Sequence, residues 1–481
     1  MANILSQIID HKRIEVAERK QQVELSTFID QVKPSTNSFF DALNAKKTTG
    51  KPGFILECKK ASPSKGLIRA DFNLAEICGV YQHHATCISV LTDGHYFQGS
   101  FDYLDTVIKQ VPQPVICKDF FIDTYQVYLA RFHGANAILL MLSVLDDTEY
   151  AELATLAKSL NMSILTEVSN EQEMFRALAL DANILGINNR NLRDLSTDTR
   201  RTLELVELIP ADRRDELVVI SESGINNHQQ VKQLSQVADG FLVGSSLMAK
   251  DDIDAACKRM IDGEHKICGL GKPADAIAAH QGGATFGGLI FYPKSPRHTT
   301  VENAATIIAA AALNYVGVFV NEDSSKVAEI ATKLKLAAVQ LHGSEDQDYI
   351  DQLRPLLPEN CQIWKAKAIK DQLPDFSESE SVDRFVLDTF HQDLPGGSGQ
   401  TFDWSLLDQL PADKLFMIAG GLHQDNVVAA YQHISVGLDI NSGVEDQPGF
   451  KNPDKIKQIL TLITTKPKHG LTKSNKRTQE K

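Results

Sequence analysis

The segment LVVISESGINNHQQVKQLSQVADGFLVGSS (217–246) contains one complete unit of the pattern that fills most of this chain. Two short apolar, β-branched runs, 217–223 and 239–244, enclose a stretch with helical spacing, 229–236. A strand, a helix and a second strand in that order predict parallel strands joined by a crossover. Both runs end in glycine-containing turns, SESG and VGSS.

Outward from this segment, the same unit recurs through the first half of the chain. Its strand candidates are FILEC (54–58), TCISVLT (86–92), PVICKDF (114–120), NAILLML (136–142), MSILTEV (162–168), NILGINN (183–189), LVVISES (217–223) and DGFLVG (239–244). A second series is KICG (266–269), GGLIF (287–291), YVGVFV (315–320), AAVQLHG (337–343), QIWKAK (362–367), RFVLDTF (384–390), LFMIAGG (415–421) and VGLDINSG (436–443). Each series of eight predicts a closed barrel, so we expect an α/β protein of two consecutive (β/α)8 TIM barrels.

The domain boundaries follow from the ends of the two series. We expect a first barrel over residues 1–260 and a second over 265–465, joined where Gly263 follows the amphipathic helix Ile253–Ile261. Residues 1–50 are expected to form a helical extension, at about Ile4–Leu25 and Ser38–Lys46, packed across one end of the first barrel. The basic tail, 466–481, predicts disorder, the alternative being an RNA or membrane contact.

Composition limits the class of protein. The 481 residues carry a formal charge of −13, which argues against general nucleic-acid binding. The seven cysteines contain no CxxC pair, and no histidine cluster has ligand spacing, so we expect a reducing, cytoplasmic chain without metal or cofactor. The charged residues near the N-terminus and the shortness of the apolar runs lead us to expect neither a signal peptide nor a segment that spans a bilayer.

Glycine-rich turns end the seventh and eighth predicted strands of both series. The first half has SESG and VGSS, and the second half has IAGG and INSG, with the same interval from Gly224 to Gly244 as from Gly421 to Asn441. Glycine lets the backbone approach a phosphate, and the loops after strands seven and eight often form such a site in barrels. We therefore expect a small phosphorylated substrate in each barrel. The residues concerned are Ser223, Gly224, Gly244, Ser245, Gly420, Gly421, Asn441 and Ser442.

Ionisable residues also gather at the predicted strand ends. Those of the first half are Glu57, Lys59, Lys118, Glu167, Asn188, Arg190 and Glu222. Their convergence on one end of a barrel, opposite a phosphate site, predicts an acid–base constellation that works without metal. The set in the second half is smaller: Cys268 ends the first strand and Asp388 ends the sixth. Taken alone, either residue could serve a purely structural purpose.

Several motifs of the first half resemble indole-3-glycerol-phosphate synthase. They are ILECKKASPSKGLI, VLTDGHYFQGS, VICKDFFID, LTEVSN, GINNRNL, ISESGI and FLVGSSLM, in order up to about residue 260. That family closes an indole ring from a carboxyphenylamino-deoxyribulose phosphate, with loss of carbon dioxide and water. The resemblance implies that Lys118 is the general acid on the ketone, Glu167 the base of the later dehydration and Lys59 a second acid.

The same resemblance implies supporting roles for the neighbouring residues. Glu57, Asn188 and Glu222 would orient the acid–base groups, while Ser62 and Arg190 would contact substrate. Phe97, in the Tyr96–Phe97 pair, either stacks on the aryl ring or packs in the core. We expect neighbouring charge and partial burial to lower the pKa of Lys118, so that it can release its proton near neutral pH.

Motifs of the second half resemble phosphoribosylanthranilate isomerase over about residues 265–460. They are KICGL, GLIFYPKSPR, VQLHG, FVLDT, GGSGQTFDW, MIAGGL and GLDINSGVE. The resemblance implies an Amadori rearrangement in which Asp388 protonates the furanose oxygen and Cys268, with its pKa lowered by the site, removes the C2 proton. Arg297 would hold the anthranilate carboxylate.

The same resemblance also concerns His342, Asp439, Gly397 and the pair Gly271-Lys272. His342 and Asp439 are each either a ligand contact or a structural hydrogen-bond partner. Gly397, in the GGSG segment (396–399), would belong to a loop that closes over the substrate. Gly271-Lys272 departs from the small polar residue expected after CGL, which puts in doubt any ligand contact at that position.

Two rival interpretations fit the residues less well, since Cys268 and every other acid or base that the motifs match are present. A histidine-pathway isomerase runs the same rearrangement on another amine, but it predicts a carboxylate where Cys268 stands. A non-catalytic regulator that binds phosphometabolites predicts a lost acid or base. We expect phosphorylated anthranilate–sugar substrates for both barrels, no nucleic acid or membrane partner, and a monomer.

Overall fold

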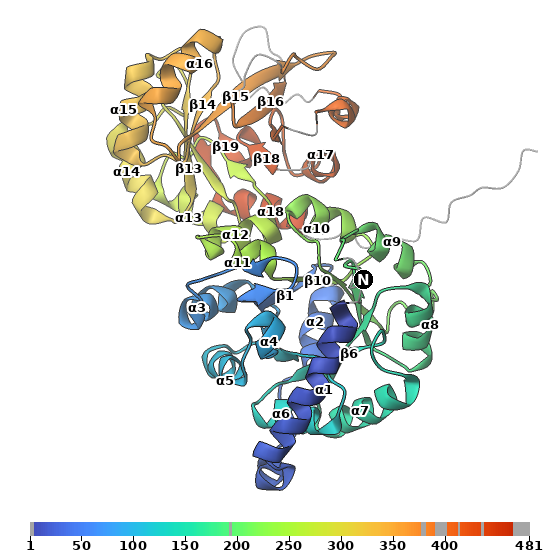
Figure 1. The fold of residues 1–481 in the computed structure, drawn as a ribbon. Helices are drawn as coiled ribbons and strands as arrows, with labels where there is room; N and C mark the ends of the chain where they lie inside the picture. Colours follow the sequence, from blue (N-terminus) through green and yellow to red (C-terminus); the bar gives the residue numbers. More distant parts are fainter. Residues whose placement is uncertain are drawn as a thin grey trace, which may run out of the picture. The chain divides into compact units, whose positions relative to one another are not determined.

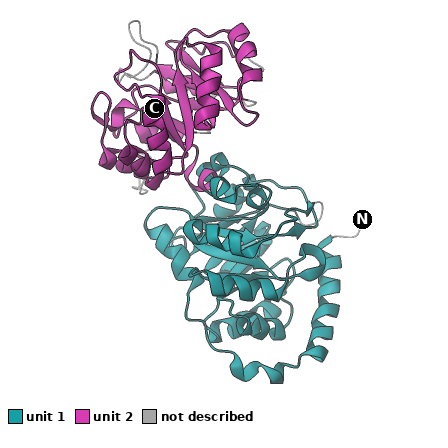
Figure 2. Ribbon diagram, turned by 90° about the vertical axis from the view of Figure 1, so that its left-hand side faces the viewer, with its two compact units in different colours: residues 1–257, 465–481 teal, residues 258–464 magenta. Residues whose placement is uncertain are grey.

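Each half of the chain forms a closed barrel of eight parallel strands in this computed structural model, which describes residues 4–191, 195–376, 381–389, 402–411, 414–433 and 437–464 (Figure 1). The segment 396–399, with Gly397, and the tail 466–481 lie outside the described residues. Contacts group Met1–Cys257 in a first unit and Lys258–Thr464 in a second (Figure 2). The predicted fold class is confirmed.

In the first barrel, each strand pairs with its neighbours in the sequence, and the last strand pairs with the first. The strands are β1 (Gly53–Cys58), β4 (Cys87–Leu91), β5 (Val115–Lys118), β6 (Ala137–Met141), β7 (Ser163–Val168), β8 (Ile184–Asn188), β9 (Val218–Glu222) and β10 (Gly240–Val243). Closure brings Gly53 of β1 opposite Gly240 of β10. A short hairpin, β2 (Ala61–Ser62) with β3 (Gly66–Leu67), follows β1.

Helices precede, separate and follow these strands. They are α1 (Ile4–Gln22), α2 (Phe39–Thr48), α3 (Leu74–His84), α4 (Gly94–Phe97), α5 (Phe101–Gln110), α6 (Thr124–Phe132), α7 (Asp147–Ser159), α8 (Glu171–Ala179), α9 (Arg200–Val206), α10 (His228–Leu234), α11 (Ser245–Met248) and α12 (Ile253–Asp262). Short polar caps start several of them, as where the Asp146 side chain accepts a hydrogen bond from the backbone of Glu149 at the start of α7. The alternation of strand and helix keeps all eight strands parallel.

The second barrel repeats this order. Its strands are β11 (Lys266–Ile267), β12 (Phe286–Ile290), β13 (Asn314–Phe319), β14 (Ala338–Leu341), β15 (Gln362–Ile369), β16 (Arg384–Thr389), β17 (Phe416–Ile418) and β18 (Gly437–Ile440). Its helices are α13 (Pro273–Gln281), α14 (Val301–Ala310), α15 (Ser324–Leu334), α16 (Gln347–Leu353), α17 (Val427–Gln432) and α18 (Pro453–Thr464). A hairpin of β19 (Glu445–Gln447) and β20 (Phe450–Lys451) follows β18.

The interior of each barrel is packed with side chains and is not a channel. Ile55, Leu165 and Ile220 belong to the core inside the first barrel, and Trp364 and Phe286 pack edge to face in the second. The Arg384 guanidinium lies 4.7 Å from the Trp364 ring centre. Because these interiors are filled, ligands can enter only at the ends of the strands.

The helices α1 and α2 lie at opposite ends of the first barrel, so the expectation that the N-terminal extension packs across one end is wrong. The backbone N–H of Phe40 in α2 donates to Ser163 Oγ at the start of β7, 3.2 Å away. Lys47 Nζ, also in α2, donates to the carbonyl of Leu217, just before β9. These contacts hold α2 under the amino ends of the strands, whereas α1 is anchored at their carboxyl ends.

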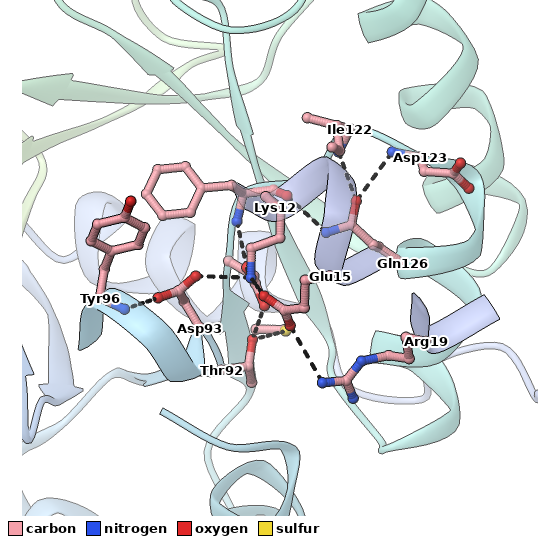
Figure 3. A network of polar contacts seen from close by, with 12 residues as sticks. Lys12, Glu15, Arg19, Thr92, Asp93, Tyr96, Ile122, Asp123 and Gln126 are labelled. Atoms are coloured by element: carbon pink, nitrogen blue, oxygen red, sulfur yellow. Dashed lines mark hydrogen bonds and ion pairs between the residues drawn. The ribbon is translucent and has the colours of Figure 1, made fainter. Parts of the chain in front are cut away.

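The anchor of α1 is a buried cation, Lys12, surrounded by carboxylates (Figure 3). Its Nζ lies 2.9 Å from both Asp93 and Asp119, which follow β4 and β5, and 2.6 Å from Glu15. Thr92 Oγ1 donates to the second oxygen of Asp119 at 2.6 Å. Burial lowers the pKa of Lys12, but the three carboxylates raise it by more, so its pKa stands above the usual value. Lys12 is therefore charged in the folded protein.

Replacing Lys12 by Met leaves two buried carboxylates without their cation. Breaking a buried ion pair from one side costs about 3–5 kcal/mol, so we expect a loss of that size in the free energy of unfolding of the first unit. Equilibrium urea titration measures it. Arg13→Met is the matched control, because Arg13 pairs with Asp10 at the exposed surface, and it should change that free energy by less than about 0.5 kcal/mol. Equal losses for the two variants would contradict the anchoring role of Lys12.

Candidate active sites

A cavity of about 490 Å³ opens at the carboxyl ends of the first barrel's strands. Every site residue predicted for the first half lines it. These residues are Glu57, Lys59, Ser62, Phe97, Lys118, Glu167, Asn188, Arg190, Glu222, Ser223, Gly224, Gly244 and Ser245. Parallel strands bring their carboxyl ends to one rim, which is why residues far apart in the sequence meet here.

Lys118, at the end of β5, lies between two carboxylates. Its Nζ donates to Glu222 Oε2 at 2.7 Å and is 3.5 Å from Glu167 Oε2. Asn188 Nδ2 donates to the other oxygen of Glu167 at 3.0 Å, which fixes the plane of that carboxylate. A proton donor and a possible base thus share one wall of the cavity.

The expectation that the site lowers the pKa of Lys118 is wrong. Burial does lower the pKa of this amine, but Glu222, Glu167 and Glu57 together raise it above its usual value. Burial also raises the pKa of Glu222, the charge of Glu167 adds to this effect, and Lys118 opposes it only in part. In the ligand-free protein Lys118 is therefore protonated at neutral pH.

Two glycines make room for the carboxylates of this cavity. A Cβ atom at Gly244 would lie 2.4 Å from Glu57 Oε2, and one at Gly186 would lie 2.0 Å from Glu222 Oε1. Glu57 in turn lies 2.5 Å from Lys59 Nζ, two residues further along the chain. Lys59 Nζ is 6.0 Å from the ring centre of Phe97, so this aromatic ring borders both the cation and the cavity.

A smaller cavity, of about 80 Å³, lies in the second barrel. The predicted site residues that line it are Cys268, Arg297, His342, Asp388, Gly420, Gly421, Asp439, Asn441 and Ser442. Gly397 lies outside the described residues and cannot be placed. The phosphate loops and the two proton-transfer residues predicted for the second half thus share one cavity.

Cys268 lies against a buried lysine that the sequence analysis did not select. Lys266 Nζ is 3.2 Å from Cys268 Sγ, 2.7 Å from Asp439 Oδ2 and 2.8 Å from Gln340 Oε1. Burial raises the pKa of Cys268, and Lys266 lowers it only in part, so the expectation of a net lowered pKa is wrong for the ligand-free protein.

Asp388 faces His342 across the cavity. Its Oδ2 lies 3.4 Å from His342 Nε2, while Gln340 Nε2 lies 3.1 Å from His342 Nδ1. Because the Gln340 amide N–H donates to Nδ1, His342 favours the tautomer that carries its proton on Nε2, which is directed at Asp388. His342 therefore has a structural partner on each side, and it also lines the cavity.

One edge of the Arg297 guanidinium is already engaged. Its Nε and Nη2 each donate to the carboxylate of Glu445 at 2.8 Å, and Lys451 Nζ donates to the same carboxylate at 2.7 Å. Lys451 also donates to Asn441 Oδ1 at 2.7 Å, in the predicted phosphate loop. The pair with Glu445 holds the guanidinium plane and leaves the Nη1 edge for a ligand.

Gly271 and Lys272, where the sequence departs from the expected pattern, do not line the cavity. Their backbone N–H groups donate to Asp275 Oδ2 at 3.0 and 3.2 Å and so form the start of α13. The departure falls on a helix cap and not on the wall of the site.

Comparison with known proteins assigns the two halves. Residues 5–260 match the family model described as indole-3-glycerol phosphate synthase, and residues 265–461 match that of N-(5'phosphoribosyl)anthranilate (PRA) isomerase. Tryptophan biosynthesis protein TrpCF of Salmonella typhi is 53% identical over 463 residues, covering 96% of this chain and 99% of that protein. The chain belongs to this fused synthase–isomerase family. It is a bifunctional enzyme of tryptophan biosynthesis, with a lyase and an isomerase activity.

Another TrpCF relative agrees with this assignment. The TrpCF protein of Yersinia pestis is 52% identical over 460 residues, covering 96% of this chain and 94% of that protein. Among solved structures, phosphoribosyl anthranilate isomerase from Thermotoga maritima is 32% identical in sequence. The match covers 42% of this chain and 98% of that chain, with a TM-score of 0.37.

In the synthase unit, sequence reasoning missed the part of the wall that α1 supplies. Ile4, Leu5 and Ile8 line the cavity from the N-terminal helix. Their spacing on one helix face was a usable signal for burial, but nothing in it distinguishes a cavity wall from ordinary core. The buried Lys12 places them there, because it ties α1 to the carboxyl ends of β4 and β5.

In the isomerase unit, the missed residues are polar groups that support the predicted ones. They are Lys266, Gln340, Glu445 and Lys451. The two-residue offset of Lys266 from Cys268 puts both side chains on one face of an extended chain, which was the one available signal.

Among the described residues, no group of three or more His, Cys, Asp or Glu side chains could hold a metal ion. In the same residues, no helix is both long and apolar enough to cross a membrane.

Replacing Glu222 by Gln removes the carboxylate that raises the pKa of Lys118 most. We expect the pKa of Lys118 to fall, so the alkaline limb of the synthase kcat/KM profile, where this amine loses its proton, should move to lower pH. Glu222→Asp keeps the charge and should leave that limb near its wild-type position. Identical limbs for the Gln and Asp variants would refute the electrostatic account.

Proposed function

We propose that the synthase barrel closes the indole ring with Lys118, Glu167 and Lys59 as its acid–base groups. Lys118 donates its proton to the ketone oxygen as the aromatic ring attacks the carbonyl carbon. Its ammonium, held by Glu222 and Glu167, is protonated in advance and directed into the cavity. An amine with a raised pKa suits an oxygen that becomes strongly basic as negative charge develops on it.

The later steps fall to the other two groups. Loss of carbon dioxide restores the aromatic system, and Glu167 then serves as the base for dehydration while Lys59 protonates the departing hydroxyl. Asn188 holds Glu167 in a fixed orientation, and Glu57 pairs with Lys59. Ser62, Arg190 and Phe97 contact the substrate, while Ser223, Gly224, Gly244 and Ser245 receive its phosphate.

In the isomerase barrel, Asp388 protonates the furanose oxygen. The C1–O bond breaks with its electron pair going to that oxygen, and the nitrogen lone pair forms a C1=N bond. Cys268, as thiolate, then takes the C2 proton; the C2–H pair becomes a C1=C2 bond and the C1=N pair returns to nitrogen. The resulting enol relaxes to the ketone. A thiolate suits this step because it is less strongly hydrated than an oxyanion.

Arg297, His342 and Asp439 complete this proposed site. The Nη1 edge of Arg297 takes the anthranilate carboxylate, since Glu445 holds the other edge. Gly420, Gly421, Asn441 and Ser442 receive the phosphate, and Gly397 belongs to this site by resemblance alone.

The observation that supports the proposal is that, in each barrel, the residues proposed as acid–base groups and the glycine loops line one cavity. The test is to supply phosphoribosylanthranilate to the purified protein, without metal or nucleotide, and to follow the formation of indole-3-glycerol phosphate. Product formation is expected. Its absence, with a folded protein, would favour a non-catalytic phosphometabolite-binding protein.

We also propose that the protein acts as a monomer in a reducing cytoplasm and binds no nucleic acid. All seven cysteines are free and buried, which fits a compartment where disulfides do not form. Static light scattering tests the monomer.

Substitutions in one barrel should silence one activity. Cys268→Ala or Asp388→Asn should lower the isomerase rate by about 10²–10⁴-fold while the synthase persists. Lys118→Ala or Glu167→Gln should do the reverse. Separate assays with the two substrates measure this. Loss of both activities from one substitution would show that the two sites are not independent.

Arg297→Lys keeps the positive charge but removes the planar fork. We expect KM of the isomerase to rise about 10-fold or more while kcat changes less, because one charge-assisted hydrogen bond to the substrate carboxylate is lost. Steady-state kinetics of both reactions measure it, with the synthase of the same chain as the control. An unchanged KM would remove Arg297 from the carboxylate site.

A further inference from the structure

The Lys266 ammonium is the most deeply buried charge near the isomerase cavity. The side chain is fully excluded from solvent, and its three contacts are Cys268 Sγ, Asp439 Oδ2 and Gln340 Oε1. An ammonium has three protons to donate, so these contacts use all of them. Burying an ammonium costs free energy, and this cost is offset only where the partners of the charge are well placed.

The neighbouring strand leaves room for this arrangement. A Cβ atom at Gly288 of β12 would lie 2.8 Å from Cys268 Sγ and 2.9 Å from Lys266 Cε. Any side chain at this position would push the lysine and the cysteine apart. Gly288 therefore allows the contact between ammonium and sulfur to form.

The charged groups around Cys268 shift the pKa of its thiol in opposite directions. The charged and titratable groups are Lys266 on β11, Asp439 on β18, Lys451 on β20, Tyr292 and Arg297 after β12, and Asp388 and His342 in the same cavity. Burial raises the pKa of the thiol, and Lys266 opposes burial most strongly, ahead of Lys451. Asp439, like burial, raises the pKa of the thiol. Its carboxylate also raises the pKa of Lys266 and so keeps that amine protonated.

We propose that Lys266 is a positioning residue of the isomerase reaction, whose buried ammonium pairs with the thiolate of Cys268 and orients its sulfur toward the substrate. The inference rests on the proposed function, in which Cys268 is the base. When the thiolate takes the C2 proton, the ammonium keeps Asp439 and Gln340 as partners, so the lysine stays in place through the reaction. The pair with Asp439 thus makes Lys266 a fixed positive charge.

The test uses Lys266→Met in the full chain. A base must be deprotonated, so the isomerase kcat/KM rises with pH through the pKa of the thiol, and loss of the ammonium moves that limb to higher pH. We expect a shift of at least about one unit and a fall of about 10-fold or more at pH 7, with partial recovery at alkaline pH. A merely structural role predicts a uniform loss at every pH and no shift of the limb, which would overturn the proposal.

A second measurement separates this proposal from the role of Cys268 as base. The rate at which iodoacetamide alkylates Cys268, followed by mass spectrometry against pH, reports thiolate formation without catalysis. The curve should move to higher pH in Lys266→Met. If Cys268→Ala retains isomerase activity, the proposed function fails, yet the alkylation curve still reports the pairing. An unmoved alkylation curve refutes the pairing itself.

Two further variants serve as controls. Lys365→Met removes another buried lysine of the same barrel, paired with Glu345 at 2.8 Å and without contact to Cys268, and should leave both pH curves unmoved. If Lys266→Met lacks the unfolding transition of the second unit, Lys266→Gln replaces it, since an amide can still hydrogen-bond to Asp439 without charge. The same shift is expected, and its absence again refutes the proposal.

Discussion

Closure of the eight-stranded ring is the constraint on which the rest of each unit depends. Pairing of the last strand with the first, as between Gly53 and Gly240, removes both sheet edges, while the helical crossovers keep every strand parallel. All carboxyl ends then fall on one rim, so single residues from five or six strands become neighbours. Neither cavity could be assembled on an open sheet of the same sequence, because its first and last strands would lie far apart.

Both cavities contain a buried lysine that is kept charged by neighbouring carboxylates, although the residues differ. Each holds a buried lysine against acidic side chains: Lys118 lies between Glu222 and Glu167, and Lys266 pairs with Asp439. Burial alone would discharge such an amine, but the carboxylates keep it protonated. The rim of each cavity thereby carries a cation that belongs to the chain itself.

The sequence was sufficient for the strands and for the positions of the glycine loops and of the ionisable residues that line the cavities, because these follow from periodicity and motif. It was insufficient for Lys12, Lys266 and Glu445, because each is held by a partner more than 70 positions away along the chain, respectively Asp93, Gln340 and Arg297. The pKa directions of Lys118 and Cys268 were wrong for a related reason. Burial and neighbouring charge oppose each other there, and only geometry decides which is larger.

The anchoring of α1 has a consequence for synthesis on the ribosome. The wall formed by Ile4, Leu5 and Ile8 is translated before every strand of the first barrel. Lys12 can pair with Asp93 and Asp119 only after both have emerged, and the ring closes only with β10. The nascent helix α1 therefore stays partly exposed until most of the first unit has been synthesised. Such long-range closure slows folding and leaves an apolar helix face open to other contacts in the meantime.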